Sequence, residues 1–178
     1  MNGIVRGYWA DAYYNGDFIC VKTRSGYRGG TEGGDPKGKQ YLLPPDASDI
    51  ALGAAVLDAM AHSRFVLPAP RTDVWIHPEV EFDMELYDYK KSIERYAAWT
   101  KALMERYGYK TKRALFKQMK LCGIDSKNGV VDIRPSYHEK LEGWSGDGIT
   151  EEDHVKLAAN SSAAEIGAAL RLAFSRCT

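Results

Sequence analysis

The sequence lacks a long apolar run, an excess of one charge and a dense group of cysteines. No apolar stretch approaches the roughly 18 residues that cross a bilayer, so we expect no membrane span. Lysine plus arginine and aspartate plus glutamate both number 24, which gives a formal net charge of zero. Proteins that bind phosphate backbones usually carry a basic excess, so we expect no direct binding of nucleic acid.

The few cysteines that are present predict the compartment. Cys20, Cys122 and Cys177 are scattered and odd in number, which is typical of reduced thiols in the cytoplasm. The N-terminus has no basic segment followed by an apolar stretch, so we expect no secretion signal. Cys122 and Cys177 lie among apolar residues, which predicts small core side chains rather than catalytic thiols.

Motifs for metals, nucleotides and phosphates are also missing. The four histidines are far apart, and the chain has neither HExxH nor CxxC, so we expect no metal and no cofactor. Residues 25–39 contain six glycines, but their spacing fits neither the dinucleotide fingerprint nor the phosphate-binding loop. Because this stretch has almost nothing to bury, we expect a loop that is either mobile or organised by a ligand or partner.

The composition that remains is that of an ordinary globular protein. A length of 178 residues with 44% apolar content is typical of a single domain, which we expect to span residues 1–178. The segments 15–17 and 126–129 have the chemistry of hairpin turns, which favours antiparallel pairing. The expected strands are 4–9, 13–23, 41–43, 121–125, 130–134 and 154–158.

Helical periodicity is found in the middle of the chain. A small helix is expected to begin after Asp46 or Ser48, because either side chain can cap it. The strongest pattern predicts a long helix over Asp83–Tyr107, which Gly108 ends. A short helix is expected over Thr111–Met119.

The C-terminal helix has the clearest start signal. It is expected to begin at Ser161 or Ser162, where Ser162 and Glu165 form a capping box. A continuous apolar stripe then runs through Ile166–Cys177. Strands and helices follow one another without regular βαβ order. We therefore expect an α+β fold with a mainly antiparallel sheet, on which a long central helix and the C-terminal helix pack.

Two runs of like charge break the otherwise even distribution. Glu79–Asp88 carries five acids and no base, and Lys110–Lys120 carries five bases and no acid. Each run is explained by a solvated helix face. Each is also explained by a surface that recognises a charged partner, since a patch of one sign steers association.

A catalytic interpretation of the polar residues is the alternative to a binding function. His138, Glu139 and His154 are suited to acid–base chemistry in a small cytoplasmic hydrolase or nucleic-acid-processing enzyme, with Lys112 and Arg113 holding phosphate. No nucleophile signature or paired-carboxylate motif accompanies them. Structural or surface histidines explain the same residues.

Three segments of the C-terminal half resemble a known family. They are YGYKTKRALFKQMKLCGI, RPSYHEKLEGWSGDGI and EIGAALRLAFSRC, and they are similar to bacterial contact-dependent growth inhibition (CDI) immunity proteins. The resemblance implies a small cytoplasmic protein without enzymatic activity. Such a protein would bind the C-terminal domain of a large toxin, commonly a nuclease, and block it. We expect a heterodimer in which the chain occludes the active site of the toxin.

The family pattern supplies no binding motif, so interface residues are predicted from charge and aromatic content. An acidic surface that mimics phosphate would suit a basic nuclease and raise the association rate. Tyr27 and Arg28 of the glycine-rich stretch are the next candidates, since aromatic and arginine side chains anchor interfaces. The acidic candidates are Glu79, Glu81, Asp83, Glu85 and Asp88.

Overall fold

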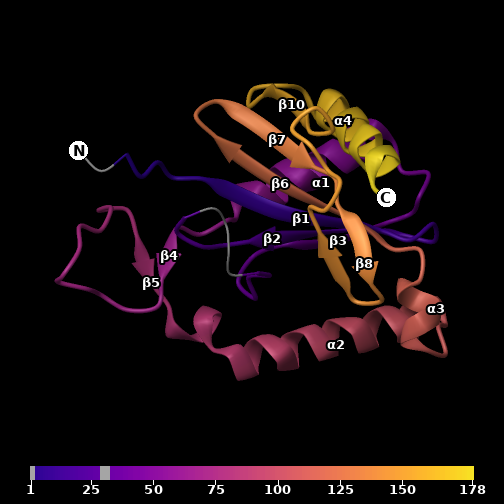
Figure 1. The fold of residues 1–178 in the computed structure, drawn as a ribbon, viewed down its shortest axis with the longest axis horizontal. Coiled ribbons are helices and arrows are strands. Elements are labelled where there is room, and N and C mark those ends of the chain that lie inside the picture. Colours follow the sequence, from indigo (N-terminus) through magenta and orange to yellow (C-terminus); the bar gives the residue numbers. More distant parts are fainter. Residues whose placement is uncertain (1–2, 29–32) are drawn as a thin grey trace.

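A six-stranded antiparallel sheet forms the centre of the protein (Figure 1). The computed structural model of the chain describes residues 3–28 and 33–178. The strand order is β10-β7-β6-β1-β2-β3, so the predicted mainly antiparallel sheet is confirmed. Its strands are β1 (Tyr8–Tyr14), β2 (Ile19–Arg24), β3 (Gln40–Leu43), β6 (Lys120–Lys127), β7 (Val130–Arg134) and β10 (Val155–Ala158).

Helices cover both faces of this sheet. Figure 1 shows α1 (Asp49–Ala61) and α4 (Ala163–Arg176) on one side and α2 (Tyr89–Tyr107) and α3 (Lys112–Phe116) on the other. Because successive strand residues point to opposite faces, Ile19 and Val21 pack with α1 and α4. Phe18 and Cys20 pack with the second pair. The fold is α+β, as the sequence predicts.

The two helices of the first layer touch at two glycines. An ideal Cβ on Gly53 of α1 would lie 1.6 Å from the carbonyl oxygen of Ala163, and one on Gly167 of α4 would lie 1.9 Å from that of Asp49. Both contacts involve backbone atoms at the start of the facing helix, which cannot move aside as a flexible side chain does. Glycine is therefore required at both positions.

Two predicted turns, at residues 15–17 between the paired strands β1 and β2 and at residues 126–129 between β6 and β7, and two predicted caps are confirmed. The β6–β7 hairpin turns at Asn128 and Gly129, whose φ angles of 51° and 77° match the positive values that such tight turns need. Ser48 caps α1, and Ser162 caps α4 in a complete capping box with Glu165. The α4 stripe that includes Ile166, Leu170 and Phe174 is buried, as predicted.

The long helix starts later than predicted. Asp83 caps a single 3-10 turn, η1 (Met84–Tyr87), and Asp88 then caps α2, so the prediction of one helix over Asp83–Tyr107 is wrong at its N-terminus. Each aspartate bonds a nearby backbone N–H and ends the preceding segment, which periodicity alone does not reveal. Gly108 ends α2 in the left-handed conformation, with φ at 73°, as predicted.

Only the C-terminal half of α2 packs on the sheet. Trp99 and Leu103 are buried there, whereas Tyr89 is 80% exposed and Ile93 is 50% exposed. The predicted short helix follows as α3, where Leu115 and Phe116 are buried. The N-terminal half of α2 therefore presents apolar side chains to solvent.

Several strand boundaries also differ from the predictions. The first strand begins at Tyr8 rather than at residue 4, and the predicted run 13–23 contains the end of β1, a turn and most of β2. Two small sheets were not predicted, because two- to four-residue strands carry almost no periodicity. They are the parallel pair β4 (Val66–Leu67) and β5 (Glu81–Phe82), and the antiparallel pair β8 (Tyr137–Lys140) and β9 (Gly143–Ser145).

Candidate partner-binding surface

Residues 64–88, here called the arm, connect α1 to α2 and carry β4, β5 and η1 (Figure 1). The backbone N–H of Glu81 donates to the carbonyl of Phe65 at 2.8 Å, and that of Asp83 donates to the carbonyl of Leu67 at 2.9 Å. The Tyr87 hydroxyl donates to the carbonyl of Val66 at 2.5 Å. These hydrogen bonds connect the first residues of the arm to its last residues.

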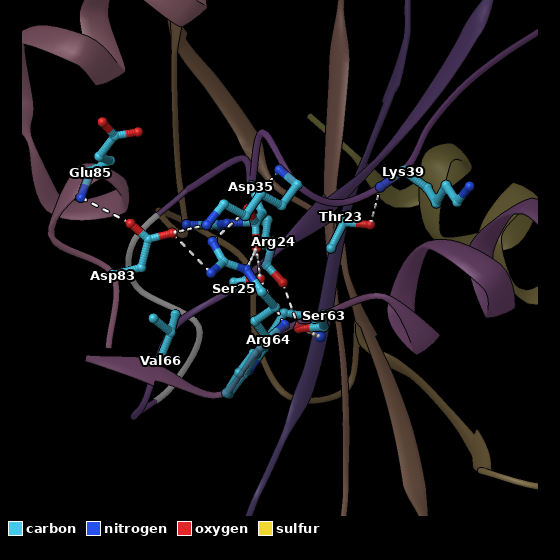
Figure 2. A network of polar contacts seen from close by, with 12 residues as sticks. Thr23, Arg24, Ser25, Asp35, Lys39, Ser63, Arg64, Val66, Asp83 and Glu85 are labelled. Atoms are coloured by element: carbon cyan, nitrogen blue, oxygen red, sulfur yellow. Dashed lines mark hydrogen bonds and ion pairs between the residues drawn. The ribbon is translucent and has the colours of Figure 1, made fainter. Parts of the chain in front are cut away.

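A buried ion-pair network joins the arm to the loop after β2 (Figure 2). Arg64 lies at its centre, with Nε 2.6 Å from Asp35 Oδ2 and Nη1 2.9 Å from Asp83 Oδ2. The Ser25 hydroxyl donates to Asp35 Oδ2 at 2.6 Å. The Asp35 side chain is fully buried, so its charge depends on these donors, because an unpaired buried carboxylate is costly.

The network shifts the pKa of both carboxyl groups. Burial would raise the pKa of Asp35, but hydrogen bonds from Arg64 and Ser25 outweigh it and hold the pKa below its usual value. Hydrogen bonds from Lys37 and Arg64 lower the pKa of Asp83 to about 2. Both groups are therefore ionised at neutral pH.

A second group of hydrogen bonds connects the end of α1 to the sheet (Figure 2). The Ser63 hydroxyl donates to the carbonyl of Arg24 at 2.5 Å and accepts from the backbone N–H of Trp9 at 3.1 Å. The backbone N–H of Arg64 donates to the Ser25 hydroxyl at 2.8 Å. The N-terminal end of the arm is thus hydrogen-bonded next to both β1 and β2.

An aromatic cluster fills the space between the arm and the sheet. Tyr27 stacks on Phe65 with ring centroids 4.8 Å apart, and Trp9 joins the same cluster. The Tyr27 hydroxyl accepts from the backbone N–H of His77 at 3.0 Å. Tyr27 is therefore buried within the fold, which corrects its prediction as a surface anchor, whereas Arg28 is exposed.

The outer side of the arm and the start of α2 expose many apolar side chains. Six large ones occur within residues 74–93. Single exposed apolar side chains are normal on a protein surface, whereas a group of this size indicates an interaction site. We call the exposed large apolar and acidic side chains of this stretch the arm surface. Its members are Val74, Trp75, Glu79, Glu81, Phe82, Met84, Glu85, Tyr89 and Ile93.

The predicted acidic run is not a helix face. It passes through β5 and η1 and ends at the Asp88 cap of α2. Asp83 is turned inward to Arg64 and Lys37, and Asp88 caps a helix, so neither is free to meet a partner through its carboxylate. Glu79 and Glu81 are exposed, and Glu85 pairs with Lys91 at 2.5 Å.

The residues of the catalytic alternative have separate neighbours. His138 on β8 stacks on Trp144 with centroids 5.0 Å apart, and its Nε2 lies 3.0 Å from the carbonyl of Leu141. His154 lies beside Asp132 of β7 instead, with Nδ1 3.1 Å from Oδ1. The structure therefore does not assemble them into one acid–base pair.

The remaining polar residues named for that alternative are also apart. Glu139 follows His138 on β8 and is exposed, whereas Lys112 pairs with Glu142 at 3.1 Å. Arg113 lies on α3 and is exposed. Within residues 3–28 and 33–178, no group of three histidine, cysteine or acidic side chains is arranged to hold a metal ion.

The glycine-rich stretch is better anchored than its composition predicts. Ser25, Tyr27 and Asp35 are buried, and Asp35 accepts hydrogen bonds from the Ser25 hydroxyl and the backbone N–H of Lys37. The expectation of almost nothing to bury is therefore wrong for both described flanks of the stretch. Residues 29–32 of this prediction lie outside the described part of the chain.

No helix in the part of the chain that the structure describes is long and apolar enough to cross a bilayer. Exposed apolar side chains grouped on one segment, as on the arm surface, are typical of a region that contacts another protein.

Comparison with known proteins identifies the family. The model of the CdiI family, described as CDI immunity protein, matches residues 8–177. The chain is 58% identical over 177 residues to the immunity protein CdiI-YPIII of Yersinia pseudotuberculosis serotype O:3 (strain YPIII), with 99% of each chain covered. The chain belongs to the CdiI family, and the resemblance seen in its sequence is confirmed.

Solved structures agree with this assignment. A chain of a CdiA-CT/CdiI toxin and immunity complex from Yersinia pseudotuberculosis matches with a TM-score of 0.95 and 57% identity, over 98% of this chain and 99% of that one. A protein of unknown function from Neisseria meningitidis matches with a TM-score of 0.80 and 36% identity, over 100% and 99% of the two chains. Both solved structures thus share the fold of this chain.

Proposed function

We propose that this chain binds the C-terminal toxin domain of a cognate CDI system in the cytoplasm and neutralises it as a one-to-one inhibitor. Family membership over residues 8–177 supports an immunity function. A relative that is 57% identical was solved as a toxin and immunity complex, which supports a toxin domain as the partner. The protein acts by binding and carries out no reaction of its own.

The arm surface is the proposed contact with the toxin, and this rests on one observation. Exposed apolar side chains such as Trp75 and Met84 occur along the same segment as exposed carboxylates such as Glu79 and Glu81, and the Arg64 network holds that segment to the fold. Interfaces need buried aromatic anchors with a polar rim, and a pre-ordered surface loses little entropy on binding.

The finer proposal concerns the toxin. We propose a nuclease with a basic substrate groove, and the carboxylates of the arm surface cover that groove in place of phosphates. Opposite charges on the two surfaces would speed encounter and make the association rate depend on salt. Glu79 and Glu81 are the charges that carry this effect, because Asp83 and Asp88 are used within the fold.

The test compares matched pairs of exposed apolar residues. Trp75→Ala with Met84→Ala should weaken toxin binding by about tenfold or more, because each removes an anchor. The control, Ile50→Ala with Leu172→Ala, changes exposed residues of the α1 and α4 layer and should leave the dissociation constant within about twofold. Equal losses in both pairs, or a loss only in the control, would move the interface away from the arm.

Charge reversal tests the finer proposal separately. Glu79→Lys with Glu81→Lys should slow association and reduce its salt dependence, whereas Lys110→Glu with Lys117→Glu should not. Association rates at two salt concentrations give the answer. If the lysine reversal alone slows association, the proposed acidic contact is wrong.

A check on enzymatic activity completes the test. The purified protein should turn over neither RNA nor DNA, and His138→Gln should still protect cells that produce the toxin domain. Turnover that disappears with His138→Gln would overturn the proposed inhibitor function.

A further inference from the structure

Two cysteine thiols meet between the sheet and the end of α4. Cys122 lies on β6, and Cys177 is the C-cap residue of α4, so 55 positions of sequence separate them. Their sulfur atoms are nevertheless 3.6 Å apart. A disulfide bond needs about 2.05 Å, so the sulfurs would have to approach by roughly 1.5 Å.

The two thiols differ in exposure. Cys122 is fully buried, whereas Cys177 is partly exposed and lines an open cleft of about 620 Å³. Lys117, Lys120 and His138 line the same cleft beside Cys177. An oxidant can therefore reach Cys177 from solvent. The buried sulfur of Cys122 lies within contact distance of the Cys177 sulfur.

The surroundings also favour reaction at Cys177. A hydrogen bond from the Cys122 thiol, a backbone N–H and the charge of Lys120 outweigh burial and lower the pKa of Cys177 to about 7. Burial raises the pKa of Cys122 well above its usual value, which keeps that group a neutral thiol. Thiolate is the reactive form, so Cys177 reacts first.

We infer that Cys122 and Cys177 form a reversible redox site that closes to an intramolecular disulfide when the protein meets a peroxide. The Cys177 thiolate attacks hydrogen peroxide, breaks the O–O bond and becomes a sulfenic acid, while the other oxygen leaves as water after taking a proton. Cys122 then attacks the Cys177 sulfur, and its proton leaves with the hydroxyl group as a second water. Two thiols lose two electrons in total, and one peroxide accepts them.

The disulfide would tie the C-terminal end of the chain to the centre of the sheet. Thr178 is already hydrogen-bonded to β8 and to the residue before it. Its carbonyl oxygen accepts from the backbone N–H of His138 at 2.7 Å, and its backbone N–H donates to the carbonyl of Ser136 at 3.1 Å. A cross-link between positions far apart in sequence stabilises a fold chiefly by restricting the unfolded chain. The arm lies at the other end of the molecule from the C-terminus (Figure 1), so this site acts separately from the proposed toxin contact.

The experiment treats the full chain with a small excess of hydrogen peroxide and counts free thiols after denaturation. The count should fall from three to one, with a Cys122–Cys177 peptide in a protease digest, and a thiol reductant should restore all three. The melting temperature should rise on oxidation by on the order of 5 °C. Toxin binding should stay unchanged.

Matched variants separate this site from general oxidation. Cys20→Ser should keep the response, and Cys177→Ser, which changes the half-exposed member, should abolish it. A reductant-insensitive oxidation of Cys177, a disulfide between two chains, or a linkage that involves Cys20 would each overturn the proposal. Cys122→Ala gives a second test, because it should leave Cys177 as a sulfenic acid that a dimedone-type probe traps.

Discussion

The α1 and α4 layer and the arm are held to the same sheet by different forces. The layer is an apolar core in which two helices touch through Gly53 and Gly167, and its sheet side is lined by residues such as Ile19 and Val21. The arm has a small aromatic cluster and depends on Arg64 and its carboxylate partners. A helix layer formed by packing is resistant to pH, whereas a segment held by buried charges is sensitive to it.

The largest effect is expected in the helix layer. Phe174→Ala should lower the free energy of unfolding by about 3–5 kcal/mol, because a large buried side chain leaves a cavity. Leu172→Ala on the exposed side of the same helix is the control and should change it by less than about 1 kcal/mol. Chemical denaturation of both variants gives the values. A small loss for Phe174→Ala would mean that α4 is not part of the core.

The matching change in the arm is Arg64→Met. It leaves the buried Asp35 carboxylate without its main donor, and we expect a loss of about 3 kcal/mol in the free energy of unfolding. Arg71→Met breaks a fully exposed pair with Asp73 and should leave the free energy of unfolding nearly unchanged, because solvent screens such pairs. Limited proteolysis should cut the arm of Arg64→Met before the helix layer. Cleavage that begins in α1 or α4 would contradict the comparison.

A methyl group tests the helix contact itself. Gly53→Ala should cost about 1–3 kcal/mol, since the new Cβ would meet the backbone of Ala163 and push the helices apart. Gly146→Ala adds the same atom where nothing lies within 4 Å, and its melting temperature should stay close to that of the original protein. Equal melting temperatures for the two variants would show that α1 and α4 pack less closely than described.

Acid should act on the arm more than on the helix layer. The pKa of Asp83 in the folded protein is about 2, below the value of about 3.9 in an unfolded chain, and that of Asp35 is also lowered. Their stabilisation is therefore complete above about pH 4 and is lost as the pH falls towards 2. The melting temperatures of the original protein and of Arg64→Met should converge over this range. A constant difference would place the effect of Arg64 elsewhere.

The same contrast explains what the sequence could predict. The capping box at Ser162, the turn at Asn128 and the stripe through Phe174 are local signals, and the structure confirms all three. The pairing of Arg64 with Asp35 joins residues 29 positions apart, across a stretch whose composition resembles a free loop. No spacing rule reveals such a pair, so the burial of Asp35 and Tyr27 was not predicted.

The partner surface was predicted only in part for the same reason. The acidic run from Glu79 onward was visible in the sequence, but which carboxylates serve the fold depends on where Arg64 and Lys37 lie. Tyr89 and Ile93 fit the apolar helical period of α2, yet both side chains are exposed. Periodicity identifies an apolar face and does not identify what covers it.

Amide hydrogen exchange with and without the cognate toxin domain tests the central claim most directly. We expect slower exchange in residues 74–93 when the toxin domain is bound, while α1 and α4 exchange as they do in the free protein. Slower exchange confined to the α1 and α4 layer, with residues 74–93 unchanged, would contradict it.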